Sequence, residues 1–438
     1  MSVELVTLIM FGSLVVVLMM GVPIAWCLGG VAIVVCYVLW GTEGLMLIVF
    51  NTFGCMWNIV LVAIPLFMSM GILLERAGIA EALFETMHRW SGPLRGGIAM
   101  GVVGICIIFA AMTGVTAAAT LTMGLIALPA MLKRGYDKHI ALGTIAGPGT
   151  LGILIPPSII SILIALVGGI SVGKLFMAGI FPGLVLAGLF IAYIGIRAWL
   201  NPKLCPPHPE KFTLKEKLIS LRAVLLPLMI ILAVLGSIFF GIATPTEAGS
   251  VGVVAVLMAV AVHRRFSWKL IKETTIETFR ITGLTMWIFF GAMAFSAVFA
   301  RAGGAVFVTD LVMGLGLGRW GILIALNLVA FLLGCFLDNF AIIFILCPIA
   351  FPIIKALDFD PVWFGILFVI NMQIGYMSPP FGYQLFYLKS VAPPGVTTED
   401  IYKSVLPFIV IMIFGMVILM AFPQITLWLP ELMMELRG

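Results

Sequence analysis

The chain has 438 residues, of which 63% are hydrophobic and 10% are charged, and its formal net charge is +5. Soluble globular proteins carry about 25% charged residues, so this composition excludes a water-soluble fold and predicts an all-α polytopic membrane protein. The lysines and arginines are spread over short loops and form no basic stripe, which argues against a nucleic-acid-binding protein.

The first apolar segment follows a start without basic residues, and no small-residue cleavage site comes after it. We therefore expect a membrane span there and not a removable signal peptide. The seven cysteines fall mostly within apolar segments and lack disulfide or zinc spacing, and the four histidines lie in or beside loops. These features favour buried thiols and argue against a metal centre or an organic cofactor within the membrane.

A membrane-spanning helix needs about 20 apolar residues. In chain order, the predicted segments are 3–20, 23–40, 57–74, 98–132, 139–168, 174–196, 223–241, 245–262, 281–300, 321–354, 362–390 and 405–430. Segments 98–132 and 321–354 are too long for one span, and each carries small or polar residues at its middle. We interpret both as re-entrant helical hairpins that return to the side they entered from; two ordinary spans in each segment are the alternative.

The remaining ten segments are predicted to cross the membrane, which sorts the basic residues by side. One face receives five of the 24 lysines and arginines, and the opposite face receives the other 19. The five are Lys174, Arg301, Arg319, Lys355 and Arg437. The positive-inside rule makes the more basic face cytoplasmic, so we expect a bacterial inner membrane protein with both termini in the periplasm.

Residues 1–200 and 223–438 are predicted to be two copies of one unit, because short motifs recur at a nearly constant separation. The matching pairs are Gly21-Val22-Pro23 with Thr244-Pro245, Arg76-Ala77-Gly78 with Arg301-Ala302-Gly303, Pro129 with Pro352, and Pro156-Pro157 with Pro379-Pro380. Each copy would contain five crossings and one hairpin, and an odd number of crossings inverts the second copy. Inverted repeats are typical of secondary transporters. Residues 201–222, with several prolines and lysines, are predicted to form the cytoplasmic linker.

Both halves interrupt a predicted helix at corresponding places, residues 147–158 and 375–382. A double proline removes backbone donors and separates two half-helices. Carbonyl groups released before the break suit Na⁺, whereas N–H groups and the positive dipole end after it suit a carboxylate. We therefore expect substrate contacts at Pro157, Ser158, Pro380 and Gly382. A proline kink without a binding role is the alternative.

The middles of the two hairpins are predicted to supply further ion ligands. Thr113, Gly114 and Thr116 lie in the first hairpin, and Asp338 and Asn339 lie in the second. Asp338 is the only acid in its apolar segment, which makes it a functional candidate. It is also a suitable N-cap for the second arm of the hairpin, and the two roles are compatible.

Two other polar motifs are predicted to be structural or to lack a role. Thr244-Pro245-Thr246-Glu247 has the spacing of a capping box with proline at the first helical position, which favours a structural role for Glu247. His139 lies near Asp137 in a predicted loop without a third partner, so we assign it no function.

Three motifs together resemble the large membrane subunit of tripartite ATP-independent periplasmic (TRAP) transporters. They are residues 243–248 (Ala-Thr-Pro-Thr-Glu-Ala), residues 154–158 (Leu-Ile-Pro-Pro-Ser) and residues 378–382 (Ser-Pro-Pro-Phe-Gly), and the resemblance covers essentially the whole chain. The resemblance implies an elevator mechanism, coupling to a Na⁺ gradient and import of an organic acid. It also implies two partners, a periplasmic substrate-binding protein and a small four-helix membrane subunit that would be a separate chain here.

The resemblance also implies two Na⁺ sites, each between a hairpin turn and the following helix break. The first would use Thr113, Gly114, Thr116, Gly149, Thr150 and Pro156, and the second Asp338, Asn339, Gly375, Met377, Ser378 and Pro379. Family members often have a Ser-Gly-Ser-like turn in the first hairpin, whereas this chain has Met112-Thr113-Gly114-Val115. Fewer hydroxyl groups are therefore available as side-chain ligands in the first site.

Two other functions are alternatives to this interpretation. A stand-alone Na⁺-coupled divalent-anion symporter would share the repeats and hairpins but would need no binding protein. An intramembrane enzyme would need a buried nucleophile with a base, or a metal cluster such as His-x-x-x-His, and neither motif occurs within a predicted span. The sequence therefore favours a transporter and not an enzyme.

Overall fold

The computed structural model describes residues 1–91, 94–207, 212–262, 264–379 and 381–437, and these residues form helices and connections without β-strands. The first half contains α1 (Val3–Met19), α2 (Ile24–Met56), the short 3₁₀ helix η1 (Ile59–Val62), α3 (Ala63–Arg76), α4 (Ile79–Ser91), α5 (Gly97–Thr113), α6 (Thr116–Lys133), α7 (Lys138–Gly149), the 3₁₀ helix η2 (Thr150–Ile153), α8 (Ile159–Gly168) and α9 (Val172–Leu200).

The second half contains α10 (Leu214–Ser220), α11 (Arg222–Phe239), α12 (Pro245–Val262), α13 (Trp268–Arg301), α14 (Gly304–Met313), α15 (Gly318–Gly334), α16 (Asn339–Ala356), α17 (Pro361–Met377), α18 (Tyr383–Val391), α19 (Thr398–Ala421) and α20 (Gln424–Glu435). The predicted all-α class is confirmed. Among the described residues, eight helices are long and apolar enough to cross a membrane, or nine if the bent pair α10 and α11 counts as one span.

Several predicted boundaries were wrong. The segment expected to end at residue 40 continues in α2 to Met56 through a kink at Gly41, whose φ of 66° suits glycine. Helix α13 begins at Trp268, thirteen residues before the predicted start at residue 281. The prediction missed these first turns because they are polar and do not raise the local hydropathy. The single segment 405–430 is two helices, since α19 ends before Pro423 and α20 begins after it.

Two helices that hydropathy missed, α4 and α14, follow α3 and α13 directly. Helix α4 carries charged residues on one face and apolar residues on the other, so it lacks the continuous apolar run that predicts a span.

The predicted linker 201–222 also contains an ordered helix, α10, whose capping box joins Thr213 to Glu216. Leu204 accepts a hydrogen bond from the Asp137 N–H at 2.8 Å, so the start of this linker packs on the helical body. Linker residues 208–211 lie outside the described part.

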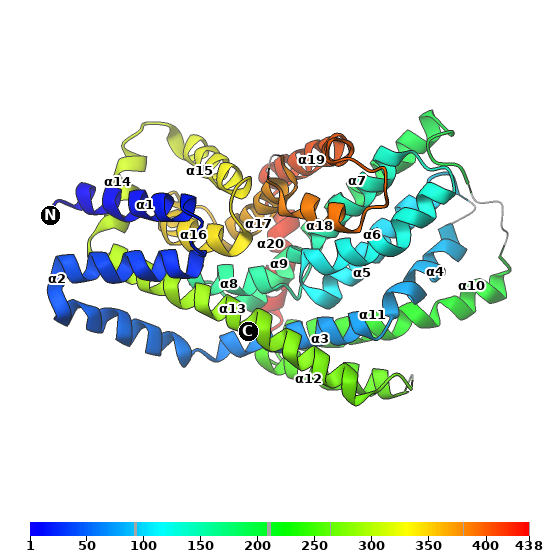
Figure 1. Cartoon of the computed structure of the whole chain (residues 1–438), viewed down its shortest axis with the longest axis horizontal. Helices are drawn as coiled ribbons and strands as arrows, with labels where there is room; N and C mark the ends of the chain where they lie inside the picture. The colour runs from blue at the N-terminus through cyan, green and yellow to red at the C-terminus, as the bar shows by residue number, and fades with distance from the viewer. Residues whose placement is uncertain (92–93, 208–211, 263, 380, 438) are drawn as a thin grey trace.

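The long helices α2, α13, α3, α11 and α12 form one side of an elongated molecule, and the broken helices lie with the hairpin arms on the other side (Figure 1). Helices α2 and α13 pack closely where two glycines face each other. A Cβ atom built on Gly291 would lie 2.6 Å from the Ala25 carbonyl oxygen, and one built on Gly29 would lie 3.7 Å from Gly291 Cα. Small residues of this kind allow helices to approach each other closely in membranes.

Several helix starts and caps of the two halves lie at the separation found in the sequence. Helices α6 and α16 begin at residues 116 and 339, and α7 and α17 begin at residues 138 and 361. The N-caps also correspond: Asp137 accepts hydrogen bonds from the N–H groups of the second and third residues after it, and Asp360 does the same. Gly78 and Gly303, which follow α3 and α13, both have positive φ values.

Candidate functional site

The first helix break lies between α7 and α8 and is completely buried. Helix α7 ends at Gly149, the 3₁₀ turn η2 follows, and α8 begins after Ser158. The prolines at 148, 156 and 157 supply no N–H donors, so the regular hydrogen-bond ladder cannot continue. Two hydroxyls bind local carbonyls instead: Thr150 Oγ1 donates to Gly147 O at 2.7 Å, and Ser158 Oγ donates to Ile153 O at 2.7 Å. Ser158 is also the N-cap of α8.

The turn of the first hairpin, residues 114–115 between α5 and α6, packs against this break. Gly114 has a φ of 64°, and a Cβ atom there would collide with the Pro157 carbonyl oxygen. From the other side, a Cβ atom on Gly152 would lie 2.8 Å from Val115 O and 3.2 Å from Thr116 N. Thr113 Oγ1 donates to Phe109 O at 2.9 Å. The structure therefore packs the turn that contains Gly114 against the first break through backbone groups of both elements, and the assignment of these residues to an ion site stays a prediction.

The second break lies between α17 and α18. Ser378 is the C-cap of α17; its N–H donates to Gly375 O, its hydroxyl donates to Ile374 O at 2.7 Å, and its carbonyl accepts from the Gly382 N–H at 3.0 Å. Met377 is buried and Pro379 is half-buried. The predicted substrate residue Pro380 lies outside the described residues.

The second hairpin reaches this break through its own turn, residues 335–338. A Cβ atom on Gly375 would lie 2.8 Å from Gly334 Cα, so α15 and α17 touch through their backbones. The Phe336 and Phe381 rings lie 5.8 Å apart.

Asp338 is the N-cap of α16, as the sequence analysis considered. Its Oδ1 accepts a hydrogen bond from Ala341 N at 2.7 Å. The neighbouring Asn339 is 5% exposed, and its Oδ1 has no hydrogen-bond partner among the described residues. The capping box at Thr244 and Glu247 is also present, since Thr244 N donates to Glu247 Oε2 at 2.8 Å and Glu247 N donates to Thr244 Oγ1 at 3.3 Å.

Two buried glutamines, which the sequence analysis missed, join the halves at the breaks. Gln373 Nε2 donates to Thr150 O at 3.0 Å, and these two residues are 223 positions apart, the separation of the repeated motifs. Gln384 Nε2 contacts Thr120 Oγ1 and donates to Ala146 O at 3.2 Å. Both side chains are fully buried, and neither Oε1 has a partner among the described residues. A glutamine inside an apolar segment was the available signal.

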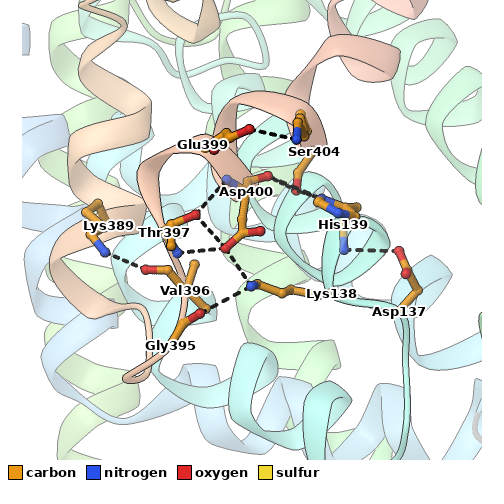
Figure 2. Close-up of polar contacts among 11 residues, drawn as sticks. Asp137, Lys138, His139, Lys389, Gly395, Val396, Thr397, Glu399, Asp400 and Ser404 are labelled. Atoms are coloured by element: carbon orange, nitrogen blue, oxygen red, sulfur yellow. Dashed lines mark hydrogen bonds and ion pairs between the residues drawn. The ribbon is translucent and has the colours of Figure 1, made fainter.

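A second set of polar contacts joins the start of α7 to the connection between α18 and α19 (Figure 2). Lys138 Nζ lies 2.5 Å from Asp400 Oδ2 and donates to Gly395 O at 3.2 Å. Thr397 and Asp400 form a capping box at the start of α19. The Lys138 ammonium and then the Thr397 N–H hold the pKa of Asp400 well below its usual range.

His139 also belongs to these contacts, which corrects the prediction that it lacks a third partner. It is the second residue of α7, and its Nδ1 lies 3.1 Å from Ser404 Oγ and 3.3 Å from Asp400 O (Figure 2). The sequence could not indicate this arrangement, because its two sides are more than 250 residues apart.

Comparison with known proteins places this geometry in a family. A family model described as the DctM component of the tripartite ATP-independent periplasmic transporter matches residues 11–425. The C4-dicarboxylate TRAP transporter large permease protein DctM of Pseudomonas aeruginosa is 36% identical over 85% of this chain and 86% of its own length. The isethionate TRAP transporter permease protein DctMQ of Oleidesulfovibrio alaskensis is 30% identical over 96% of this chain and 66% of its own length.

Among solved structures, the YdaH transporter of Alcanivorax borkumensis has the same fold, with a TM-score of 0.62, 15% sequence identity, and coverage of 92% of this chain and 96% of its own. The family match, the relatives and the many apolar helices agree with one another. The chain belongs to the DctM family of large membrane permease subunits of tripartite ATP-independent periplasmic transporters.

Proposed function

We propose that this permease imports a small organic anion together with Na⁺ by an elevator movement of the hairpins and broken helices. The observation that carries the proposal is the pairing of a hairpin turn with a helix break in each half. Broken helices cost stability, because each interrupts a regular hydrogen-bond ladder in a buried environment. Two such pairs at corresponding positions favour a binding role over a purely structural one.

The two halves are proposed to be inverted repeats, with the first hairpin entering from the cytoplasmic face and the second from the periplasmic face. Support comes from the matching order of helices, the corresponding N-caps Asp137 and Asp360, and the hydrogen bond between the equivalent positions Thr150 and Gln373. The distribution of basic residues supports the further proposal that both termini lie in the periplasm and that the chain lies in the inner membrane.

Each pair offers the oxygen ligands that a hard monovalent cation prefers. In the first site these are the Thr113, Thr116 and Thr150 hydroxyls and the backbone carbonyls of Gly114, Gly149 and Pro156. In the second they are the Asp338 carboxylate, the Asn339 amide oxygen and the carbonyls of Gly375, Met377, Ser378 and Pro379. The Asn339 oxygen lacks a protein partner among the described residues, and this fits a cation ligand. When bound, Na⁺ would supply positive charge that favours the anion nearby.

The anion is proposed to bind where α8 and α18 begin, near Pro157, Ser158, Pro380 and Gly382. The first turns of these helices carry N–H groups and a positive dipole end, which suit an anion. The names of the relatives include a C4-dicarboxylate and a sulfonate, isethionate, and both are small anions. We propose a carboxylate-bearing substrate that a periplasmic binding protein delivers, and a small four-helix membrane subunit as the second partner.

Reconstitution tests this function. The permease is placed in liposomes with its small membrane subunit and binding protein, and uptake of radiolabelled C4-dicarboxylates is measured under imposed ion gradients. We expect uptake that requires the binding protein and follows an inward Na⁺ gradient. Uptake that ignores Na⁺ and follows a proton gradient would refute the coupling. Uptake that needs no binding protein would favour the stand-alone symporter instead.

A further inference from the structure

A cavity of about 360 Å³ lies between α4, the α10–α11 segment and the end of α12. It is separate from the two helix breaks. Thr86 Oγ1 donates to Ser220 O at 2.9 Å and so ties α4 to the end of α10 at one side of the cavity. The axes of α10 and α11 differ by 42°. The cavity contains none of the residues assigned to the transport site.

The cavity carries more positive than negative charge. Three arginines, Arg89, Arg222 and Arg265, line it together with one carboxylate, Glu85. Arg89 Nε is paired with Glu85 Oε1 at 2.8 Å, and an Arg265 guanidinium nitrogen contacts the Ala77 carbonyl oxygen. Arg222 is exposed, and no hydrogen bond or ion pair is found for it among the described residues. Neither Arg222 nor Arg265 forms an ion pair among the described residues, so both guanidinium groups can meet an anion, and the Glu81 carboxylate lies near Arg265 beside Gly78.

Apart from Thr86 and Ser220, the rest of the lining is apolar. Ile79, Ala82, Leu226, Pro227 and Val260 supply this hydrophobic wall. A small soluble anion such as phosphate would leave this wall without a partner. A ligand with an anionic group at one end and hydrocarbon at the other would satisfy both parts.

Aromatic residues place the cavity at the level of lipid headgroups. Trp90 is 41% exposed and donates through Nε1 to Lys217 O at 3.0 Å, and Trp268 is 78% exposed at the start of α13. Exposed tryptophans beside lysines and arginines are typical of a membrane–water interface. In the proposed topology this face is cytoplasmic.

We propose that the cavity binds an anionic phospholipid of the cytoplasmic leaflet. The phosphate would lie between Arg222 and Arg265, and an acyl chain would follow the apolar wall formed by α4, α11 and α12. Basic pockets between membrane helices on the cytoplasmic side suit such headgroups. The inference depends on the membrane orientation given under the proposed function, but not on the identity of the coupling ion or the substrate.

The position of the site predicts a mechanical consequence. Helix α4 connects α3, on the side of the long helices, to α5, the first arm of the hairpin that contacts the first break. A lipid held between α4 and α11 would brace this connection while leaving the helix breaks untouched. Bound lipid is therefore expected to raise the thermal unfolding midpoint of the permease.

Native mass spectrometry of the delipidated full-length permease tests the proposal, with added dioleoylphosphatidylglycerol, dioleoylphosphatidylcholine or inorganic phosphate. The variant Arg222→Gln/Arg265→Gln removes the two available charges. The control Lys272→Gln/Arg280→Gln removes two positive charges from exposed positions of α13 outside the cavity. Because Arg265 also contacts Ala77, a third variant, Ala82→Phe, fills the apolar part and keeps every charge.

We expect phosphatidylglycerol to bind the parent and the control equally. Each arginine near an anionic headgroup contributes about fivefold to the affinity, so the double arginine variant should bind about 25-fold more weakly. Ala82→Phe should also bind weakly. Equal binding by all four proteins, or equal binding of phosphatidylcholine, would overturn the proposal. Competition by inorganic phosphate would assign the cavity to a soluble anion instead.

Loss of phosphatidylglycerol binding on adding the small membrane subunit would assign the cavity to a protein interface and would overturn the lipid site. This experiment measures lipid binding and does not depend on substrate transport. A permease that binds the lipid as expected but shows no Na⁺-driven uptake would therefore refute the proposed function alone.

Discussion

Replacing Gly114 by alanine tests the contact between the first hairpin turn and the first helix break. Gly114 has a φ of 64°, and an added Cβ atom would collide with the Pro157 carbonyl oxygen, which belongs to the backbone of the break. The left-handed backbone conformation costs an alanine about 1–2 kcal/mol. Overpacking against a backbone atom that cannot rotate away adds about 1–3 kcal/mol.

Gly169 provides a matched control for this substitution. It also has a φ of 64°, but a Cβ atom there would meet nothing within 4 Å. Gly169→Ala therefore introduces the backbone strain without the collision. The difference in uptake and in unfolding midpoint between Gly114→Ala and Gly169→Ala then reports on the contact between the hairpin turn and the helix break. Gly152→Ala approaches the same contact from the other side, since its Cβ atom would lie 2.8 Å from Val115 O.

The assay combines thermal unfolding in detergent with Na⁺-dependent uptake in liposomes that contain the partner subunits. We expect Gly169→Ala to lower the unfolding midpoint moderately and to retain uptake. Gly114→Ala and Gly152→Ala should lower uptake by at least about tenfold at temperatures where both remain folded, because separated elements cannot share an ion. Equal uptake by Gly114→Ala and Gly169→Ala would refute a shared site at this contact.

Three further predictions follow from other contacts. Asp338→Asn keeps an oxygen that can accept the hydrogen bond from Ala341 N, so the thermal unfolding midpoint should stay near that of the parent. The Na⁺ concentration for half-maximal uptake should rise about tenfold or more. If this Na⁺ concentration is unchanged, Asp338 is not part of the site. Gln373→Leu leaves the buried Thr150 carbonyl without its hydrogen-bond donor. The free energy of unfolding, measured by denaturant titration, should therefore fall by about 1–3 kcal/mol. An unchanged denaturation midpoint would contradict this expectation. The pKa of Asp400 is lowered in the folded state, so the ionised carboxylate stabilises the fold. This contribution to the free energy of unfolding is fully present above the usual carboxyl pKa of about 4 and is lost as the pH falls through the lower folded-state pKa. Asp400→Asn should therefore unfold at a lower temperature than the parent throughout pH 5–8, and the difference should shrink below about pH 4; a difference that appears only above pH 7 would contradict the assignment.

The sequence predicted the local features well because their causes are local. Proline removes a donor wherever it stands, so the breaks at 147–158 and 375–382 could be located without coordinates. Capping preferences act over three or four residues, and Glu247 and Asp338 both cap helices as expected. The division of segments 98–132 and 321–354 into two helices each could be predicted from their length and from the small or polar residues at their middles.

Features that depend on distant residues were not predictable in this way. The contacts of Gln373 with Thr150 and of Lys138 with Asp400 join segments more than 200 residues apart, and no local pattern specifies them. Helices α4 and α14 were missed for a different reason: they are short or amphipathic, and a hydropathy window averages their two faces. The extra turns of α2 follow the polar Thr42-Glu43 pair, and the extra turns of α13 carry several charged residues, so the predicted spans stopped short of both.

The central claim is that two oppositely oriented halves each contribute one hairpin turn and one helix break to the transport path. Leu94 and Leu317 test it directly, since they precede α5 and α15, lie 223 positions apart and are 59% and 53% exposed. Single Leu94→Cys and Leu317→Cys variants are treated with a membrane-impermeant maleimide in right-side-out and inverted vesicles, with the parent as background for the native cysteines. We predict that Leu94→Cys reacts only from the cytoplasmic face and Leu317→Cys only from the periplasmic face. Reaction of both positions from the same face would contradict the inverted arrangement and the mechanism proposed from it.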